Sequence, residues 1–275
     1  MRTASEEGRM VEARLKDKVA IVSGAGTRGP MPGTGQATAI LYARHGAKVL
    51  LTDLDLARAE ETRASIVAEG GTASVFQADV TSEADCRGMI EACVARYGRL
   101  DVLFNNVGGI GSGKVSEIEE AQLDRSLAVN LKGAIFTCKH AIPAMTDSGG
   151  GSIINVSSID GLRAGWTPNV PYAVAKAGLA QLTRVTAVHH GRDNIRANCI
   201  APGHLYAPFV ANISDERRAL RRKAGPLGTE GDAWDVAWAA LFLASDESRW
   251  ISGAVLPIDG GLLAATPLAV YDNLA

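Results

Sequence analysis

Lys18-Val19-Ala20-Ile21-Val22-Ser23-Gly24-Ala25-Gly26 is the stretch of this sequence that decides its fold. The apolar run has the length of a buried strand, and the glycines after it let the backbone approach a ligand closely. Gly33-Thr34-Gly35 follows and opens a helical pattern. A helix that begins there offers free N–H groups and the positive end of its dipole to a pyrophosphate. The order of strand, glycines and helix therefore predicts a dinucleotide site at Gly24 and at the segment 33–35.

An acidic residue, Asp53, ends the second strand-like run, Lys48–Asp53. A carboxylate at this place in a nucleotide-binding fold accepts hydrogen bonds from the adenosine ribose hydroxyls and repels a 2′-phosphate. Asp53 therefore predicts NAD rather than NADP as the cofactor. NADP remains the alternative, because Arg28 in the loop before Gly33 could reach a 2′-phosphate.

Strand-like runs and helical patterns alternate along the chain. Such alternation indicates βαβ units and a parallel sheet. The strands are continuous apolar runs, as expected where both faces of a sheet are covered. We therefore predict an α/β fold, a Rossmann-like doubly wound parallel sheet with helices on both faces. The expected strands are Lys18–Ser23, Lys48–Asp53, Ala73–Gln77, Val102–Asn105, Ser152–Val156, Arg196–Ile200 and Ala254–Ile258, and the expected helices are Gln36–His45, Leu56–Glu69, Glu83–Tyr97, Gln122–Met145, Pro171–His190 and Gly231–Ala244.

The composition is that of one globular domain. The chain has 275 residues, of which 47% are hydrophobic and 21% charged, and a formal net charge of −2. We expect neither nucleic acid nor membrane as a partner, since no basic face dominates and no apolar run approaches the ~20 residues of a membrane span. The cysteines lack CxxC spacing, and His189-His190 lacks a third ligand. We therefore expect reduced thiols, no metal and a cytoplasmic protein.

Several further motifs occur in a fixed order along the chain. They are Ser23-Gly24…Gly33-Thr34-Gly35, Asp79-Val80, Asn105-Asn106-Val107-Gly108, Asn130, Ser158, Tyr172-x-x-x-Lys176 and Pro202-Gly203. With these motifs the chain resembles the classical short-chain dehydrogenase/reductase (SDR) family over roughly residues 15–263. The resemblance implies one Rossmann-like domain, 15–263, that carries the cofactor and substrate sites together, between an N-terminal extension, 1–14, and a C-terminal tail, 264–275. It also implies a homotetramer, which the long apolar helical patterns favour.

The chain departs from the family pattern in the glycine motif and near Pro202-Gly203. Thr27–Pro32 holds about five residues more than the family has between its first two glycines, a comparison that rests on the resemblance. A rival register, Gly24-x-Gly26-x-x-Gly29, would put Pro30 and Pro32 inside the helix, so we reject it. We expect the inserted loop to lie over or beside the pyrophosphate; the alternative is a bulge that faces solvent or contacts another subunit. Ala207 stands where the family usually has a threonine that contacts the nicotinamide carboxamide.

Tyr172 and Lys176 form the pair expected to move a proton. Transfer of a hydride from an alcohol carbon requires the hydroxyl proton to leave, and a phenol with an ordinary pKa of about 10 is a weak base near neutrality. Residues four apart in a helix share a face, so the Lys176 ammonium is placed to stabilise a phenolate and lower its pKa. By resemblance Lys176 also binds the nicotinamide ribose.

Two polar residues complete the expected catalytic set. Ser158 follows a predicted strand, where ligands bind in parallel sheets, and its hydroxyl can stabilise charge on the substrate oxygen. Ser157 is the neighbouring candidate, and the register against Ile159-Asp160-Gly161 favours Ser158. The resemblance gives Asn130 a part in a water chain from the lysine to solvent.

The remaining cofactor contacts follow from the resemblance. Asn106 would contact the adenosine side and Asp79 with Val80 the adenine; the alternative for Asp79 is a turn or N-cap acid before Thr81. The full expected cofactor set is Gly24, Gly33, Thr34, Gly35, Asp53, Asp79, Val80, Asn106, Tyr172, Lys176, Pro202, Gly203 and Leu205.

The activity expected from these residues is hydride transfer between NAD(H) and a secondary alcohol or ketone. Trp166, Tyr206 and Phe209 would flank the cleft by family register and suggest a cyclic or aromatic substrate. The basic run Arg217–Lys223 is either a solvated helix face or a site for an anionic substrate. The alternatives are an NADP-dependent carbonyl reductase of the same family and a non-catalytic dinucleotide sensor, which would have little need of Tyr172 and Lys176.

Overall fold

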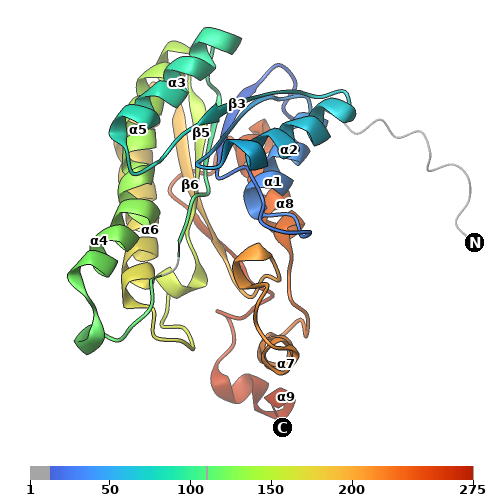
Figure 1. The fold of residues 1–275 in the computed structure, drawn as a ribbon, viewed down its shortest axis with the longest axis vertical. Helices are drawn as coiled ribbons and strands as arrows, with labels where there is room; N and C mark the ends of the chain where they lie inside the picture. The colour runs from blue at the N-terminus through green and yellow to red at the C-terminus, as the bar shows by residue number, and fades with distance from the viewer. Residues whose placement is uncertain (1–12, 110, 275) are drawn as a thin grey trace, which may run out of the picture.

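The computed structural model describes residues 13–109 and 111–274 as one seven-stranded parallel sheet covered by helices on both faces (Figure 1). The strand order is β3-β2-β1-β4-β5-β6-β7, and each neighbouring pair is parallel. The order reverses direction between β1 and β4, which is where doubly wound sheets bind their ligands. The predicted fold class is therefore confirmed.

The observed elements match the predicted alternation closely. The strands are β1 Val19–Ser23, β2 Lys48–Asp53, β3 Thr72–Gln77, β4 Val102–Asn105, β5 Gly151–Val156, β6 Ile195–Pro202 and β7 Val255–Ile258. The helices are α1 Thr34–Arg44, α2 Leu56–Ala68, α3 Glu83–Tyr97, α4 Glu120–Leu127, α5 Gly133–Asp147, α6 Val170–His190, α7 Asp215–Ala224, α8 Ala233–Ala244 and α9 Tyr271–Leu274.

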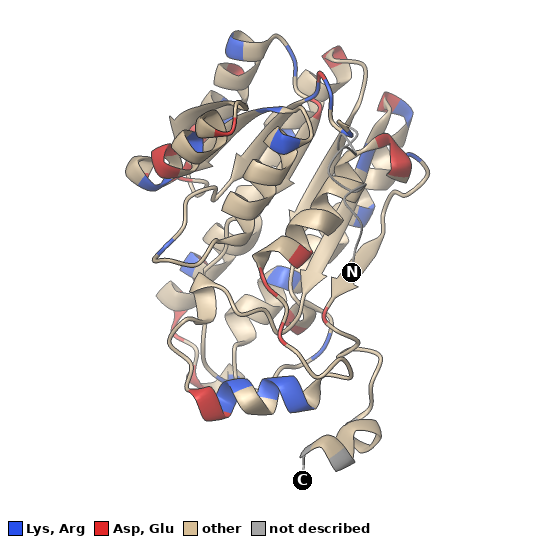
Figure 2. Ribbon diagram, turned by 90° about the vertical axis from the view of Figure 1, so that its right-hand side faces the viewer, with Lys and Arg blue, Asp and Glu red and all other residues tan. Residues whose placement is uncertain are grey.

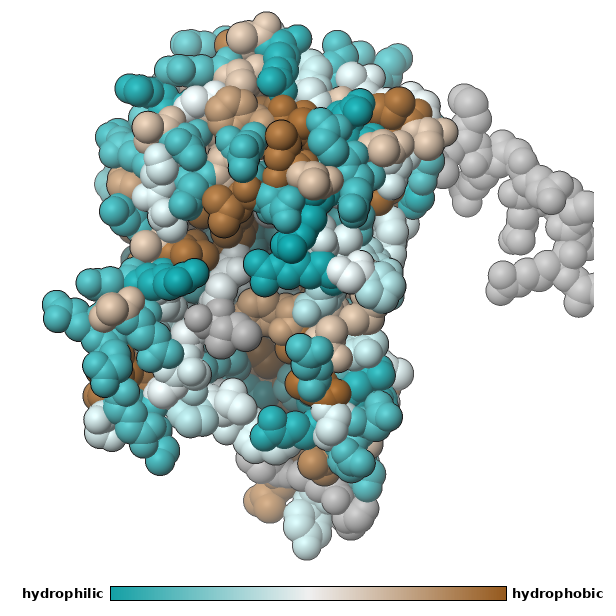
Figure 3. Space-filling model, viewed as in Figure 1, coloured by the Kyte–Doolittle hydropathy of each residue, from teal (hydrophilic) through white to brown (hydrophobic). Residues whose placement is uncertain are grey.

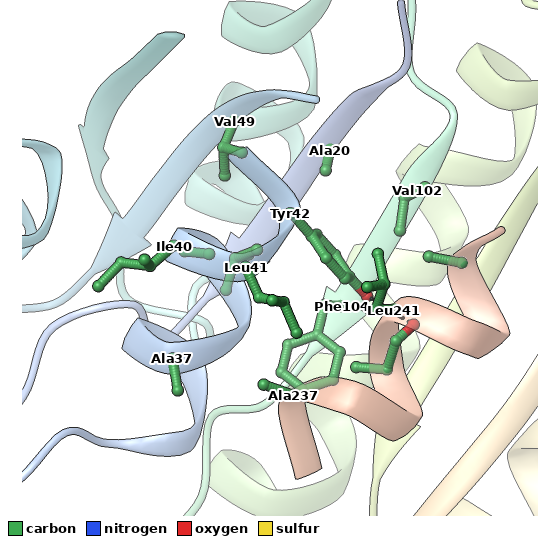
Figure 4. Packing of buried hydrophobic residues seen from close by; sticks show 14 of the residues in the cluster. Ala20, Ala37, Ile40, Leu41, Tyr42, Val49, Val102, Phe104, Ala237 and Leu241 are labelled. Atoms are coloured by element: carbon green, nitrogen blue, oxygen red, sulfur yellow. Dashed lines mark hydrogen bonds between the residues drawn. The ribbon is translucent and has the colours of Figure 1, made fainter. Parts of the chain in front are cut away.

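Two apolar layers hold the helices to the sheet, one on each face. Successive residues of β1 point to opposite faces, so Ala20 and Val22 join one layer while Val19 and Ile21 join the other. In the first layer, which includes α1 and α8, the Tyr42 and Phe104 rings meet edge to face with centroids 6.3 Å apart (Figure 4). The Tyr42 hydroxyl donates to the Ala240 carbonyl at 3.1 Å and so satisfies its buried polar atom.

The long helix predicted at Gln122–Met145 is not a regular α-helix. A π-helical turn, Ala128–Lys132, separates α4 from α5 without breaking the helical path. Such turns insert one residue into the helical repeat and often occur at functional sites. Hydrophobic periodicity alone does not reveal the insertion, because the helix before and after it keeps its own apolar face.

The segment between β6 and α8 adds a helix, α7, that was expected only as a basic run. Lys and Arg residues line α7, which lies at the end of the molecule opposite the amino ends of the strands (Figure 2). The surface is hollowed between the segments that carry α4 and α7 (Figure 3). None of the helices in the described part of the chain combines the length and the apolar character that a membrane span requires.

Candidate active site

The glycine turn after β1 is fixed by close backbone contacts. Gly24 has φ +63°, and a Cβ added to Gly35 would lie 2.0 Å from the Gly24 carbonyl oxygen. Neither position tolerates a side chain. Helix α1 begins at Thr34, so the register that starts the helix after the insertion is confirmed and the rival register is wrong. Within the insertion the Thr27 hydroxyl donates to the Met31 carbonyl at 2.7 Å, which closes the loop on itself.

The N-terminus of α1 has no side-chain cap, a property it shares with α4, α5 and α6. Helices α2, α3, α7 and α8 are capped by the side chains of Asp55, Ser82, Ser214 and Asp232. Among the described residues, no side chain caps α1 at Gly33, and its first turn holds no acid. Its first N–H groups are therefore available to an anion. The uncapped helix and the two glycines fit the pyrophosphate of a dinucleotide.

Asp53 is held in place by backbone donors on both of its oxygens. Its Oδ2 accepts from the Gly26 N–H and its Oδ1 from the Asp55 N–H, each at 3.0 Å. A Cβ added to Gly26 would lie 2.5 Å from the Arg58 Cβ and 3.0 Å from Asp53 Oδ2. Gly26 therefore lets the first turn of α2 approach the glycine turn, a role that the sequence patterns did not assign to it.

Asn106 and Asp79 make intramolecular contacts in the structure. The Asn106 amide donates to the Gly24 carbonyl at 3.1 Å and accepts from the Thr34 hydroxyl at 2.6 Å. Asn106 thus ties β4 to the glycine turn. The Asp79 carboxylate accepts from the Thr81 N–H and hydroxyl at 2.8 and 2.7 Å, which is the turn role left open by the sequence. Val80 is buried, and a Cβ on Gly133 would meet its side chain at 2.9 Å.

The three residues expected to carry the proton chemistry lie together. Tyr172 and Lys176 share one face of α6, and the lysine Nζ lies 5.7 Å from the centroid of the tyrosine ring. The Ser158 hydroxyl hydrogen-bonds the Tyr172 phenol and accepts from the Asp160 N–H at 3.1 Å. The Ser157 hydroxyl instead donates to the Lys176 carbonyl at 2.6 Å, so it ties β5 to α6. The geometry therefore favours Ser158 over Ser157.

The ionisation of this pair differs from the sequence-based expectation. Burial raises the pKa of Tyr172 to about 12, although the hydrogen bond from Ser158 lowers it, and the charge of Asp160 raises it further. Burial lowers the pKa of Lys176 to about 8. Removing both groups from water disfavours phenolate and ammonium alike.

Lys176 is a buried cation whose observed acceptor is neutral. Its Nζ donates to the Val156 carbonyl at 2.9 Å. Within the described part of the chain, no carboxylate lies within ion-pair distance of Nζ. A Cβ on Gly108 would lie 3.3 Å from both the Lys176 Nζ and the Asn130 Oδ1. The glycine therefore leaves open space where Asn130 and Lys176 approach each other.

Asn130 lies in the π-helical turn and is fully buried. Its amide donates to the Gly109 carbonyl and accepts from the Gly109 N–H, each at 3.0 Å, and it donates to the Ser126 carbonyl at 2.9 Å. A small pocket beside it is lined by Ser23, Asn105 and Asn130, among other residues. The π-helical turn thus aims one helix side chain at the loop that follows β4.

The segment after β6 forms the opposite wall of the site. The Phe209 ring lies 6.2 Å from the Tyr172 ring, and Arg217 lies over Trp166 at 4.9 Å. Gly203 packs against Asp259, where an added Cβ would lie 2.5 Å from the Asp259 Cβ. Pro202 ends β6, and the Leu205 N–H donates to the Gly203 carbonyl at 2.8 Å. The aromatic residues expected beside the cleft therefore do lie next to Tyr172 and α7.

The basic run on α7 is largely an internal ion cluster rather than a solvated face. Arg218, Arg221 and Arg222 lie 2.9, 3.3 and 3.4 Å from the carboxylate of Glu230, whose side chain is only 4% exposed. Arg218 also stacks on the Tyr206 ring at 3.4 Å. Glu230 was missed in the sequence, because an acidic residue eight positions after Arg222 has no recognisable spacing to it.

Known proteins share this architecture over most of the chain. A family profile described as enoyl-(acyl carrier protein) reductase matches residues 29–263. Levodione reductase of Leifsonia aquatica is 34% identical over 263 residues, which are 92% of this chain and 96% of that protein. A solved structure assigned to a short-chain dehydrogenase/reductase of Burkholderia xenovorans is 41% identical with a TM-score of 0.88, over 92% of this chain and 99% of that one. The chain belongs to the short-chain dehydrogenase/reductase family.

The SDR assignment makes the chain an oxidoreductase that uses a nicotinamide dinucleotide and acts on a small molecule. A further SDR relative is the 2,5-dichloro-2,5-cyclohexadiene-1,4-diol dehydrogenase of Sphingobium indicum. It is 37% identical over 250 residues, which are 90% of this chain and 97% of that protein.

Proposed function

We propose that the chain transfers a hydride between NAD(H) and a cyclic secondary alcohol or ketone, with Tyr172 exchanging the proton. The observation that carries this proposal is the cluster of the Tyr172 phenol, the Ser158 hydroxyl and the buried Lys176 ammonium. Bound NAD⁺ supplies the hydride acceptor, so that R₂CHOH and NAD⁺ give R₂C=O, NADH and H⁺.

The chain's own groups divide the work on the proton. Tyr172 removes the proton from the alcohol hydroxyl, and Ser158 donates a hydrogen bond that holds the substrate oxygen and stabilises charge on it. Lys176 supplies the positive charge that favours phenolate. Asn130 hydrogen-bonds both backbone groups of Gly109 and so fixes the loop after β4 beside Lys176. The spacing of four between Tyr172 and Lys176 favours alcohol chemistry over enoyl reduction, which in the family usually goes with wider spacing.

The preference for NAD rests on Asp53. Two backbone N–H groups fix its carboxylate, so it cannot turn away from a 2′-phosphate without losing both hydrogen bonds. Arg58, the nearest cation along α2, is paired with Asp55 at 3.1 Å. Arg28 is exposed on the inserted loop and remains the residue through which NADP could bind.

A cyclic substrate is favoured by the aromatic side chains around Tyr172. Phe209 and Trp166 are both more than half exposed beside the site and offer flat apolar surfaces. The dichlorocyclohexadienediol dehydrogenase is named for a ring compound with two hydroxyl groups, and levodione reductase is named for a dione. We infer the same substrate class for this chain.

Turnover of a cyclic secondary alcohol tests the proposal. We expect the reduced cofactor to form with cyclohexanol or a cyclohexanediol. We also expect kcat/KM for NAD to exceed that for NADP by at least about 100-fold, because the fixed Asp53 carboxylate repels the 2′-phosphate of NADP. A preference for NADP would point to Arg28. Binding of NAD without turnover of any ring alcohol would favour the sensor alternative.

Self-association as a homotetramer belongs to the same proposal. Ile135 of α5 and Val174, Val185 and Val188 of α6 expose apolar side chains on the outer helical layer. Exposed apolar side chains on neighbouring helices are typical of subunit contacts. Light scattering at micromolar concentration should give four times the 28.7 kDa chain mass, and a monomer would contradict the proposal.

A further inference from the structure

The inserted loop Thr27–Pro32 leaves the fold and re-enters it at one point. A Cβ built on Gly33 would lie 3.5 Å from the Gly26 carbonyl oxygen and 3.6 Å from the Thr27 hydroxyl oxygen, so the two ends of the loop are in contact. The Thr27 hydroxyl also donates to the Met31 carbonyl at 2.7 Å. The loop is therefore a closed excursion with a narrow base, and the glycine turn stays compact despite the insertion.

Both ends of this base belong to the parts of the structure that fit the cofactor. The Gly26 N–H donates to Asp53 Oδ2 at 3.0 Å, and Asp53 is the carboxylate expected at the adenosine ribose. Gly33 is the N-cap residue of α1, whose first N–H groups have no side-chain cap and are open to a pyrophosphate. The inserted loop therefore starts beside the ribose end of the site and returns at its pyrophosphate end.

The shape of the inserted loop is set before any ligand binds. Pro30 and Pro32 fix their own φ angles and restrict the residues before them. Gly29, with φ +81°, supplies the reversal at the tip, and a Cβ added there would meet nothing within 4 Å. A stiff loop whose tip stands clear of the rest of the protein can contact a ligand at little cost in conformational entropy.

Arg28 lies next to this tip and is exposed. Within residues 13–109 and 111–274 its guanidinium has neither a hydrogen-bond acceptor nor a carboxylate partner. Two residues separate Arg28 from Gly26, so the two Cα atoms lie within about 7 Å of each other. Arg58 approaches the same turn from α2, but it is already paired with Asp55 at 3.1 Å.

The charges at the glycine turn favour a role for Arg28 toward an anion. The pyrophosphate of a dinucleotide is a dianion, and the Asp53 carboxylate beside it is bonded only to backbone N–H groups in the described part of the chain. Like charges that lie close together repel each other, so a dianion at this place needs a cation nearby. Arg58 offsets Asp55, and Arg28 remains available.

We propose that the inserted loop covers the pyrophosphate of the bound dinucleotide, that Arg28 forms an ion pair with a pyrophosphate oxygen, and that the loop thereby slows release of the cofactor. This inference goes beyond the proposed function, because it requires only the nicotinamide dinucleotide that SDR membership assigns to the chain. NAD and NADP share the pyrophosphate, so this contact does not select between them.

Release of NADH tests the inference without any turnover. Protein loaded with NADH is mixed with excess NAD⁺ in a stopped-flow instrument, and the fluorescence lost from bound NADH gives the release rate. One variant replaces Thr27–Pro32 by a single serine, which restores the length usual in the family, and a second is Arg28→Gln. Arg63→Gln is the matched control, because this arginine of α2 is also partly exposed but already pairs with Glu60.

We expect Arg28→Gln to speed NADH release by about fivefold, the size of a partly exposed ion pair, and the shortened loop to speed it at least as much. Arg63→Gln should release NADH at the wild-type rate. At about 1 M salt, where charges act only over about 3 Å, wild type and Arg28→Gln should release NADH at nearly the same rate. In titrations, Arg28→Gln should bind ADP about fivefold more weakly and adenosine unchanged.

An unchanged release rate in Arg28→Gln, or an equal loss of affinity for ADP and adenosine, would overturn the ion pair with the pyrophosphate. Weaker binding of NADPH alone would also overturn it, because Arg28 would then contact the 2′-phosphate. A shortened variant that melts like wild type and releases NADH at the wild-type rate would show that the loop does not cover the cofactor. The Arg28→Gln results decide the question even if the shortened chain does not fold.

Discussion

Lys176 and Glu230 are two charged side chains that the fold buries on opposite walls of one site, and their surroundings differ sharply. Lys176 is 3% exposed and donates to a neutral carbonyl. Glu230 is 4% exposed and lies within 3.4 Å of three guanidinium groups. A buried charge without a counter-ion destabilises a fold. Removing one charge from a buried ion pair is also destabilising, because it leaves the remaining charge buried without a counter-ion.

From this difference we infer different roles for the two residues. The desolvated lysine destabilises the fold and stands beside the Tyr172 phenol, and a desolvated titratable group of this kind is typical of a reacting group. The compensated glutamate ties α7 to the segment before α8 and so fixes the wall that carries His204 and Tyr206. Mutations at the two positions should therefore have opposite effects on activity and stability.

Replacing Lys176 by methionine should cause the largest change. We expect Lys176→Met to lower kcat by about 1000-fold, because the phenolate loses its nearest positive charge. The unfolding free energy should stay the same or rise, since a side chain of similar length no longer has to be desolvated as a cation. Turnover and denaturant unfolding on the same preparation check both parts. A clear loss of stability would show that the lysine is structural.

Breaking the ion cluster should have the reverse effect. Glu230→Gln leaves three guanidinium groups around a neutral amide, and we expect the unfolding free energy to fall by about 3 kcal/mol. The melting temperature should fall by about 6–12 °C for a chain of this size. Glu216→Gln, at an exposed position in the first turn of α7, is the matched control and should change the melting temperature much less, since it removes only a surface charge at a helix N-terminus. Equal melting of the two variants would remove the distinction drawn between the two sites.

The lowered pKa of Lys176 predicts how stability depends on pH. In the folded chain the amine loses its proton near pH 8, and in the unfolded chain near pH 10.4. Between these values the unfolded state binds more protons, so stability rises with pH. Wild-type protein should gain up to about 3 kcal/mol relative to Lys176→Met across this window. Parallel curves for the two proteins would mean that the amine is not desolvated.

The outermost arginine of the cluster should matter least. Arg222 is 41% exposed, and its Nη1 lies 3.4 Å from the Glu230 carboxylate. Arg222→Gln should lower the unfolding free energy by about 0.5 kcal/mol, and salt should weaken the effect. Denaturant unfolding at low and high salt measures it. A loss of unfolding free energy as large as that of Glu230→Gln would contradict this, because it would mean that the Arg222–Glu230 ion pair behaves as a buried one.

The sequence predicts residues whose role depends on the local order of strand, turn and helix. It does not predict residues whose role depends on contacts between distant segments of the chain. Gly24 and Gly35 were recognisable because a strand, a turn and a helix follow one another locally. The pairing of Glu230 with α7 depends on how two loops fold together, which no local spacing encodes. The ionisation of Tyr172 was expected to be favourable because sequence spacing shows its neighbour Lys176 but not the burial of both groups.

Tyr172→Phe tests the central claim most directly, because it removes one hydroxyl and leaves the ring against Phe209. NAD affinity is measured by titration and turnover with a ring alcohol on the same sample. We expect turnover to fall by about 1000-fold or more while the Kd for NAD stays within about threefold, since only the proton carrier is lost. Turnover within tenfold of the wild-type rate would show that Tyr172 does not carry the proton.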